Sequence, residues 1–171
     1  KHNIFKILSE LSAELNIQTF VVGGWVRDSF LQRNLKSKDI DIVCNKNAIQ
    51  LAKKLAETLK TKEVIIYKNF GTALIKYKTW NIEFISARIE SYNKSSRKPD
   101  VKFGTMEDDQ KRRDFTINAM SISLNQNDFG TLIDPFNGLN DLENKIIKTP
   151  LNSDKTFSDD PLRMFRAIRF S

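Results

Sequence analysis

The residues best suited to chemistry are two aspartates in a short apolar run. Asp39 and Asp41 flank Ile40 in the sequence KDIDIVC. Because side chains alternate between the two faces of a strand, this spacing places both carboxylates on one face, with Ile40 and Ile42 on the other. Adjacent carboxylates repel each other unless a cation lies between them, and Mg²⁺ is commonly held by one or two carboxylates plus substrate phosphates. By itself the pattern also fits a half-exposed strand edge with two acids.

A glycine pair precedes these aspartates. Gly23 and Gly24 end the apolar run TFVV and are followed by Arg27 and Asp28 in GGWVRD. Glycines at a strand end let backbone N–H groups approach an anion, and the helix start that follows adds its positive end. Arg27 offers a guanidinium that fits phosphate oxygens. A tight turn with a surface Arg27–Asp28 pair is the simpler interpretation of this stretch alone, but beside the acidic strand it predicts a metal-dependent enzyme acting on a nucleoside triphosphate.

Apolar spacing predicts the elements that position these residues. Helical spacing predicts helices over Ile4–Leu15 and Ala48–Leu59 and a last helix from Asp159, with Leu162, Phe165, Ala167 and Ile168 on its apolar side. Short apolar runs predict strands at Thr19–Val22, Ile40–Val43, Val64–Tyr67, Ala73–Tyr77, Ile82–Ile85, Met120–Leu124 and Thr131–Ile133. The remaining segments are a mobile loop over Ser91–Asp109, a helix start at Asp109–Arg113 and a turn running into a short helix over Asp134–Lys145. In that turn we expect Pro135 to fix one dihedral and Gly138 to permit an unusual one.

Composition narrows the class of protein. The 171 residues include 28 Lys and Arg against 21 Asp and Glu, and the net charge of +7 favours a polyanionic partner. The single cysteine, Cys44, excludes an internal disulfide and is interpreted as a small buried residue, and the single histidine, His2, disfavours histidine-based catalysis. No run approaches the roughly 18 apolar residues of a membrane span or resembles a signal peptide, so we expect a cytoplasmic protein that does not contact a membrane. The chain lacks an initial Met and ends inside a patterned run, so we expect a fragment.

An ordered set of motifs links the chain to a family. Between Phe20 and Phe170 the motifs are GGWVRD, DIDIV, KRRDFTINAMSI, IDPFNGLNDL and DDPLRMFRAIRF. The set resembles the class II tRNA nucleotidyltransferases, or CCA-adding enzymes, and the related bacterial poly(A) polymerases of the polymerase β nucleotidyltransferase superfamily. The resemblance implies an α+β fold, with a mixed β-sheet nucleotidyltransferase head and flanking helices in residues 1–145. Residues 146–171 would then be the start of a helical neck that recognises the nucleotide base.

The resemblance also implies residue roles. Asp39 and Asp41 would bind Mg²⁺, with Glu83 as a third carboxylate unless it is simply a polar residue on an alternating strand. Asp114 would accept the ribose hydroxyls, although a charged helix start with Asp114 held by Arg113 is the structural alternative. The residues assigned to the nucleotide are Gly23, Gly24, Arg27, Arg112, Arg113, Asp114, Asn118, Asp160, Arg163 and Arg166.

The base-reading roles also have a structural alternative. Asp160 and Arg163 would read the pairing edge of the base, whereas the alternative is that Asp160 caps the helix and pairs with Arg163. Asn118 would either touch the sugar or fix Asp114. Asp159 stands where the family usually has glutamate, which leaves its role open.

The implied reaction is template-independent addition of C and A to the 3′ end of tRNA from CTP and ATP. The RNA 3′ hydroxyl would attack the α-phosphorus and pyrophosphate would leave, with two Mg²⁺ ions between the attacking and leaving oxygens. CC-only, A-only and poly(A)-adding relatives share every motif, so they stay as alternatives. A small-molecule nucleotidyltransferase would share only the glycine turn and the paired acids. A non-catalytic RNA-binding module is the alternative of another class, and the oligomeric state is left open.

Overall fold

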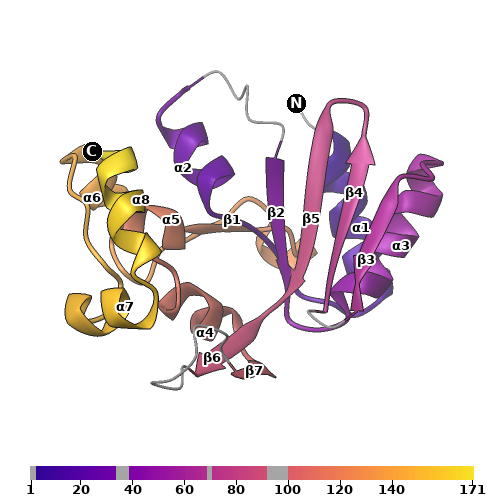
Figure 1. The fold of residues 1–171 in the computed structure, drawn as a ribbon. Helices are drawn as coiled ribbons and strands as arrows, with labels where there is room; N and C mark the ends of the chain where they lie inside the picture. The colour runs from indigo at the N-terminus through magenta and orange to yellow at the C-terminus, as the bar shows by residue number, and fades with distance from the viewer. Residues whose placement is uncertain (1–2, 34–38, 69–70, 92–99) are drawn as a thin grey trace.

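A seven-stranded sheet forms the centre of the fold, with strand order β3–β4–β5–β2–β1–β8–β9 (Figure 1). The computed structural model describes residues 3–33, 39–68, 71–91 and 100–171. The strands are β1 (Thr19–Val22), β2 (Asp39–Cys44), β3 (Val64–Tyr67), β4 (Thr72–Tyr77), β5 (Trp80–Ser86), β8 (Ser121–Ser123) and β9 (Leu132–Ile133). Only the central pair, β2 with β5, is parallel among the paired strands of this sheet. The sheet is therefore mixed, as predicted.

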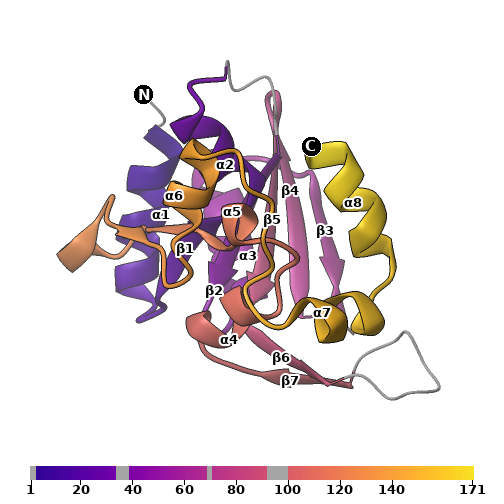
Figure 2. The ribbon, with the colours of Figure 1, turned by 90° about the vertical axis from the view of Figure 1, so that its left-hand side faces the viewer.

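Two helices cover one face of the sheet. They are α1 (Asn3–Glu14) and α3 (Ala48–Leu59), whose apolar sides pack on the inward side chains of the strands (Figure 2). Leu8 on α1, Leu51 on α3 and Ile42 on β2 are fully buried in this core. Cys44 lies in the same core, where burial raises the pKa of its thiol to about 12, which confirms its interpretation as a buried residue.

The opposite face of the sheet is only partly covered. A small apolar cluster of Phe20, Val22, Val43 and Ala87 lies on this face and packs against Met106. Met106 begins α4 (Met106–Lys111), and the ribbon of β6 (Arg88–Ser91) and β7 (Asp100–Phe103) lies beside that helix. The carboxylates of β2 are on this face, beyond the cluster.

Several short helices gather at the β8–β9 end of the molecule (Figure 1). They are α2 (Gly24–Phe30), α5 (Thr116–Ala119), α6 (Gly138–Glu143), α7 (Ser153–Asp159) and α8 (Leu162–Phe170), and the short 3₁₀ helix η2 covers Gln126–Asp128. In the part of the chain that is described, no helix combines the length and apolarity needed to cross a membrane.

Most of the predicted elements are confirmed. The seven strands and the helices α1 and α3 are present, with ends shifted by no more than two residues, and α6 follows its predicted turn. The loop predicted over 91–109 is wrong at both ends, because β6 extends to residue 91, β7 occupies 100–103 and α4 begins at 106; residues 92–99 lie outside the described part. The helix start predicted at Asp109 is wrong for the same reason. Thr105 and Asp108 form a reciprocal capping box, so the helix begins earlier and 109–111 are its last turn.

The last helical region also differs from the prediction. The helix expected from Asp159 begins at Leu162, and an unpredicted helix, α7, occupies the residues before it. Thr156 is the buried residue of α7, and its backbone N–H donates to the Asn152 carbonyl.

Gly138 is required for packing, which corrects the prediction that it permits an unusual dihedral. The left-handed residue in this turn is Asn137, with φ 60°. A Cβ on Gly138 would lie 2.3 Å from the Thr116 carbonyl oxygen, so only glycine lets α6 pack this closely against α5. Asp134 caps α6 by accepting hydrogen bonds from the Gly138 and Leu139 backbone N–H groups at 2.7 and 2.9 Å.

Candidate active site

The two aspartates lie on the open face of the central strand β2. Ile40 and Ile42 are buried in the opposite face, 1% and 0% exposed, so the predicted alternation is confirmed. Asp39 accepts a hydrogen bond from Asn81 Nδ2 at 2.8 Å. Glu83 on β5 is in register with Asp41, and aligned residues of a parallel pair share a face. The structure therefore brings Asp41 beside Glu83, although the described residues contain no group of three His, Cys, Asp or Glu side chains arranged to hold a metal ion.

The charge of Asp41 is costly in this position. Burial raises the pKa of its carboxyl, the Arg113 guanidinium opposes that shift, and the negative charge of Asp39 adds to it. The pKa of Glu83 is raised by partial burial and then by the charge of Asp41. A cation between these acids would remove both the repulsion and much of the desolvation cost. The donor set consists of carboxylate oxygens, which suits a hard divalent cation such as Mg²⁺.

The glycine turn lies directly against this carboxylate. Gly23, which lies between β1 and α2, has φ +71° and ψ −137°, a backbone conformation that residues with a side chain rarely adopt. A Cβ on Gly23 would lie 3.2 Å from Arg113 Nη1 and 3.4 Å from Asp41 Oδ2. Only a residue without a side chain therefore lets the turn lie this close to both a carboxylate and a guanidinium, the two groups expected around a phosphate beside a metal site.

Arg27 joins the start of α2 to the RRDFTINA segment. Its Nε and Nη2 bond to Asp28, so the ion pair considered as an alternative is present, but it is largely buried and not on the surface. Its Nη1 also donates to Asn118 Oδ1 at 2.7 Å, and its guanidinium lies over the Phe170 ring at 4.8 Å. Arg27 thus contacts Asn118, another residue predicted to bind the nucleotide, and is only 13% exposed.

Asp109 is the residue that the sequence reasoning missed. It is fully buried. Its Oδ1 accepts hydrogen bonds from Nε of Arg112 at 3.0 Å and from Nη2 of the same residue. Its Oδ2 accepts hydrogen bonds from Nε of Arg113 at 3.1 Å and from Nη2 of that residue. Burial alone would raise the pKa of Asp109, but the charges of Arg113 and Arg112 outweigh it and hold that pKa below its ordinary value. One buried carboxylate therefore orients both arginines.

The signal for Asp109 was in the sequence. Arg112 and Arg113 follow Asp109 by three and four residues, the spacing at which side chains meet on a helix. The alternative interpretation had paired Arg113 with Asp114 instead. In the structure the Arg113 guanidinium bonds to Asp109, and its Nη1 also reaches the Asn118 carbonyl at 3.4 Å.

Asp114 is held from three directions. Its Oδ1 accepts hydrogen bonds from the Phe115 N–H at 2.9 Å and from Asn118 Nδ2 at 3.1 Å. Its Oδ2 accepts one from Arg166 Nε at 2.6 Å. Of the two roles considered for Asn118, the fixing of Asp114 is therefore seen directly.

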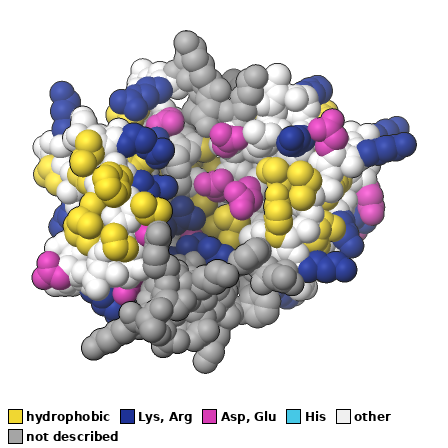
Figure 3. Space-filling model, in the orientation of Figure 1, with side chains coloured by type: hydrophobic (Ala, Val, Ile, Leu, Met, Phe, Trp, Pro, Cys, Tyr) yellow, Lys and Arg dark blue, Asp and Glu magenta, His cyan; other side chains and the backbone are white. Residues whose placement is uncertain are grey.

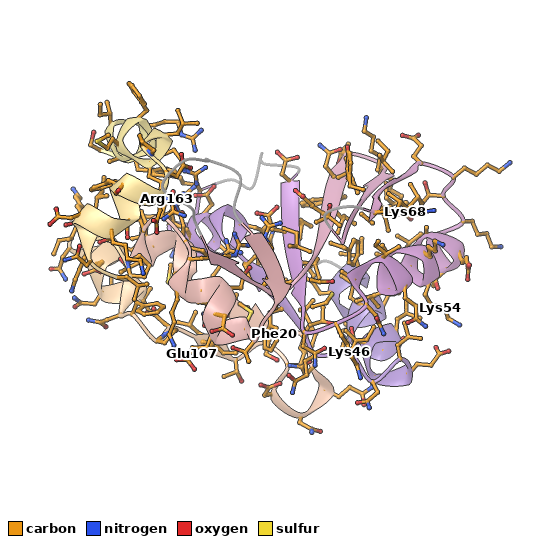
Figure 4. All side chains as sticks on the ribbon, turned by 60° about the horizontal axis from the view of Figure 1, so that its bottom comes forward. Phe20, Lys46, Lys54, Lys68, Glu107 and Arg163 are labelled. Carbon is orange, nitrogen blue, oxygen red and sulfur yellow. The ribbon has the colours of Figure 1, made fainter. Side chains whose placement is uncertain are left out.

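Asp160 and Arg163 lie at the junction of α7 and α8. Asp160 Oδ1 accepts a hydrogen bond from the Leu162 N–H at 3.2 Å, as the capping interpretation predicts. Arg163 donates from Nη1 to the Thr156 carbonyl at 3.4 Å and from Nη2 to the Arg112 carbonyl at 2.8 Å (Figure 4). Arg163 thus fastens α8 to the end of α4, close to the arginines that Asp109 holds.

Figure 3 shows charged side chains gathered on one face of the molecule. Acidic side chains lie at its centre, with Lys and Arg side chains between them and the α8 end. Hydrophobic side chains flank the acids on both sides, over α8 and over the β3–β5 part of the sheet.

The fold and this arrangement define a class of protein. A mixed sheet with paired carboxylates on its central strand and a glycine turn at the end of the adjacent strand is the head of a nucleotidyltransferase. The family described as the poly A polymerase head domain matches residues 19–148, and the chain belongs to that family.

Curated relatives agree with this family. The chain is 43% identical over 157 residues to an A-adding tRNA nucleotidyltransferase of Aquifex aeolicus, covering 91% of this chain and 18% of the relative. It is 38% identical over 168 residues to an A-adding tRNA nucleotidyltransferase of Halalkalibacterium halodurans, covering 98% of this chain and 38% of the relative. A CCA-adding enzyme of Bacillus subtilis is 36% identical over 159 residues, with 92% of this chain and 37% of the relative covered. The chain therefore spans well under half the length of these relatives.

Solved structures show the same fold. A tRNA nucleotidyltransferase complexed with a primer tRNA and an incoming ATP analog superposes with a TM-score of 0.82 at 39% identity, over 95% of this chain and 44% of that chain. A CCA-adding enzyme in an apo form superposes with a TM-score of 0.84 at 40% identity, over 98% of this chain and 39% of that chain.

Proposed function

We propose that the chain is the catalytic head of a template-independent RNA nucleotidyltransferase that adds C and A nucleotides to the 3′ end of tRNA from CTP and ATP. The observation that carries this proposal is the position of the Gly23 turn, between Asp41 and Arg113. A triphosphate at this turn would contact a guanidinium on one side and a carboxylate-bound cation on the other. Residues 1–145 would form the head, and 146–171 would begin a neck that recognises the base.

Asp39 and Asp41 would hold Mg²⁺, with Glu83 as a further carboxylate beside Asp41. The raised pKa of Asp41 supports this role, because a bound cation offsets the cost of its buried charge. Bound Mg²⁺ supplies charge neutralisation at the reacting phosphate and at the pyrophosphate. The protein contributes carboxylates fixed on a rigid strand.

The nucleotide would lie on the β1 side of these acids. Gly23, Gly24 and Arg27 would contact the triphosphate together with Arg112 and Arg113, which Asp109 orients. Asp114, fixed by Asn118, would accept the ribose hydroxyls, and Arg166 lies against the same carboxylate.

The base would be read from the junction of α7 and α8. Cytosine and adenine both present an amino donor beside a ring acceptor on the pairing edge. The Asp160 carboxylate can accept a hydrogen bond from the amino group, and the Arg163 guanidinium can donate one to the ring nitrogen. Uracil and guanine present an oxygen acceptor beside a ring N–H donor, which does not match these two side chains. Asp160 and Arg163 would therefore accept C and A without a nucleic-acid template.

In the proposed reaction, a lone pair of the RNA 3′ oxygen forms a bond to the α-phosphorus. The bond from that phosphorus to the bridging oxygen breaks, pyrophosphate leaves with the electron pair, and the hydroxyl proton passes to solvent. The protein mainly positions these groups and neutralises their charge.

The deciding experiment supplies labelled CTP and ATP, separately and together, to tRNA that lacks its 3′ end, with and without Mg²⁺. Addition of C and A by the protein as it is encoded, and its loss in Asp41→Asn, are the expected results. Binding of RNA without incorporation, unchanged by Mg²⁺ or by Asp41→Asn, would instead identify a non-catalytic RNA-binding module.

A second candidate is addition of A alone. The curated relatives at 43% and 38% identity are both named A-adding tRNA nucleotidyltransferases. In the same experiment this activity would use ATP on tRNA ending in CC and would not use CTP on any truncated tRNA.

A further inference from the structure

An apolar strip lies on the same open face as the proposed metal-binding acids. Ile65 and Tyr67 on the edge strand β3 are 43% and 45% exposed. Their neighbours Val64 and Ile66 pack against the main core, so Ile65 and Tyr67 point to the opposite face. Leu74 on β4 is half-buried on that face. We name Ile65, Tyr67 and Leu74 the β3–β4 strip.

Strand register connects this strip to the acids. Ile65 pairs with Leu74, and Leu74 pairs with Glu83. Glu83 in turn pairs with Asp41. One row across four adjacent strands therefore carries two carboxylates followed by two apolar side chains, with neighbouring strands about 4.8 Å apart.

The proposed site determines which substrate meets this strip. The triphosphate turn lies on the β1 side of Asp41, and the strip lies on its β5 side. In phosphoryl transfer the attacking and leaving oxygens are roughly in line, on opposite sides of the phosphorus. The RNA that supplies the attacking hydroxyl therefore has to approach from the β5 side, across β4 and β3.

The chemistry of the strip suits the end of a single-stranded RNA. Unpaired bases stack on aromatic and apolar side chains, and nearby cations bind the phosphates. Lys76 on β4 is exposed and pairs with Asn81, which pairs with Asp39 on the same face. A basic side chain thus borders the strip next to the acids, on a chain of net charge +7.

We propose that the β3–β4 strip is the platform on which the 3′-terminal base of the acceptor RNA stacks, so that its 3′ hydroxyl faces the carboxylates. This inference rests on the proposed function and adds the location of the RNA end. The base of a nucleotide is separated from its own 3′ hydroxyl by the ribose, a distance comparable to the spacing between Glu83 and Leu74.

The test uses the Ile65→Ala/Tyr67→Ala double variant of the full-length protein, with truncated tRNA as substrate. We expect the KM for tRNA to rise about tenfold, as for the loss of one stacked base, while the KM for ATP and kcat at saturating tRNA stay near those of the unmodified protein. Phe129→Ala is the matched control, because Phe129 is also 45% exposed but follows η2, away from the strip. This control should leave every parameter unchanged.

An abasic substrate makes the test specific for stacking. A truncated tRNA whose last nucleotide lacks its base should bind the unmodified protein and the double variant with equal affinity, because the stacking partner is gone. The affinity for tRNA is measured by fluorescence anisotropy in proteins that also carry Asp41→Asn, so that no nucleotide is added during the binding measurement.

Three results would overturn the inference. The first is an unchanged KM for tRNA in the double variant, and the second is an equal loss of affinity for intact and abasic tRNA. The third is a shift from dimer to monomer in the double variant, because that shift would show that the strip binds a second copy of the chain. Failure of the proposed function is distinguishable, because the unmodified protein would then add no nucleotide to any RNA.

Discussion

Asp114 and Arg166 form an ion pair in which Arg166 Nε donates to Asp114 Oδ2 at 2.6 Å. The pair joins α8 to the RRDFTINA segment across 52 positions of sequence. Asp114 is 7% exposed, whereas Arg166 keeps about half of its side chain in solvent. The carboxylate proposed to accept the ribose hydroxyls is thus tied to the helix proposed to read the base, which links the two kinds of recognition.

Sugar selection gives the first prediction. Asp114→Ala should lower the preference for CTP over dCTP about tenfold, mainly by weakening CTP use, because a hydrogen bond to a charged group contributes about 1.5–3 kcal/mol. The ratio of kcat/KM for the two nucleotides measures this. Glu57→Ala, which removes an exposed acid on α3 with no proposed contact with the nucleotide, is the control and should leave the ratio unchanged. An unchanged ratio in Asp114→Ala would leave Asp114 with a structural role alone.

The paired acids give the second prediction. Asp39→Asn and Asp41→Asn should each abolish nucleotide addition, because each removes a negative charge that binds the cation. Neither variant should lower the melting temperature, because the fold does not depend on that charge. Mg²⁺ should raise the melting temperature of the unmodified protein and not that of Asp41→Asn. Glu10→Gln, which changes an exposed acid on α1, should behave like the unmodified protein. Normal incorporation by either aspartate variant would refute the metal assignment.

The elements around these acids could be predicted because local patterns determine them. The spacing of Asp39 and Asp41 is a strand pattern, and Gly23 can adopt its φ of +71° because it has no side chain. The parallel pairing of β2 with β5 could not be predicted, because two intervening strands and α3 separate them and only the completed core decides which strand lies beside β2. The position of Glu83 beside Asp41 follows from that pairing.

The errors came from a segment without periodicity. Residues 100–103 form a strand by pairing with β6, a contact that their own sequence does not signal. The α4 helix begins at a capping box of Thr105 and Asp108, so its charged end was mistaken for its start. Asp109 was missed because a fully buried carboxylate is unusual, and only its two arginine partners make the burial tolerable.

The glycine turn gives the third prediction, in which the two glycines behave differently. Gly23→Ala should lose about 1–3 kcal/mol of stability because its backbone conformation is strained for a side chain. It should also lose most activity, since its Cβ would lie 3.2 Å from Arg113 Nη1 and 3.4 Å from Asp41 Oδ2. Gly24→Ala is the matched variant, because its Cβ would meet only Arg27 Nη2 at an ordinary 3.6 Å. Chemical denaturation and nucleotide addition measure both; equal effects at the two glycines would contradict the prediction.

Asp109 gives the fourth prediction, which concerns pH. Its folded pKa lies below the ordinary value of about 3.9, so its contribution to stability is present above that value and is lost as the pH falls toward the folded pKa. Asp109→Asn should therefore lower the free energy of unfolding by about 3 kcal/mol at neutral pH, because it leaves two guanidinium groups without their charge partner. Unfolding free energies of the two proteins should converge below pH 4, as the unmodified protein loses this contribution and the variant does not. A difference that stays constant from pH 7 to pH 3 would contradict the ionised state of Asp109.

Arg163 gives the last prediction, because its guanidinium has both a structural and a proposed recognition role. It donates to the Thr156 and Arg112 carbonyls, so Arg163→Ala should lower stability by about 1–2 kcal/mol. If it also reads the base edge, the variant should use CTP and ATP less well and discriminate less against UTP and GTP, since one correct base-edge contact contributes about 1–3 kcal/mol in protein–DNA complexes. Arg169→Ala, on the same helix, is the control, because Arg169 lies over the Phe170 ring and has no proposed contact with the base. Rates with all four nucleotides, measured well below each melting temperature, separate the two roles. A loss of stability with the order of nucleotide preference unchanged would assign Arg163 to the packing of α8 alone.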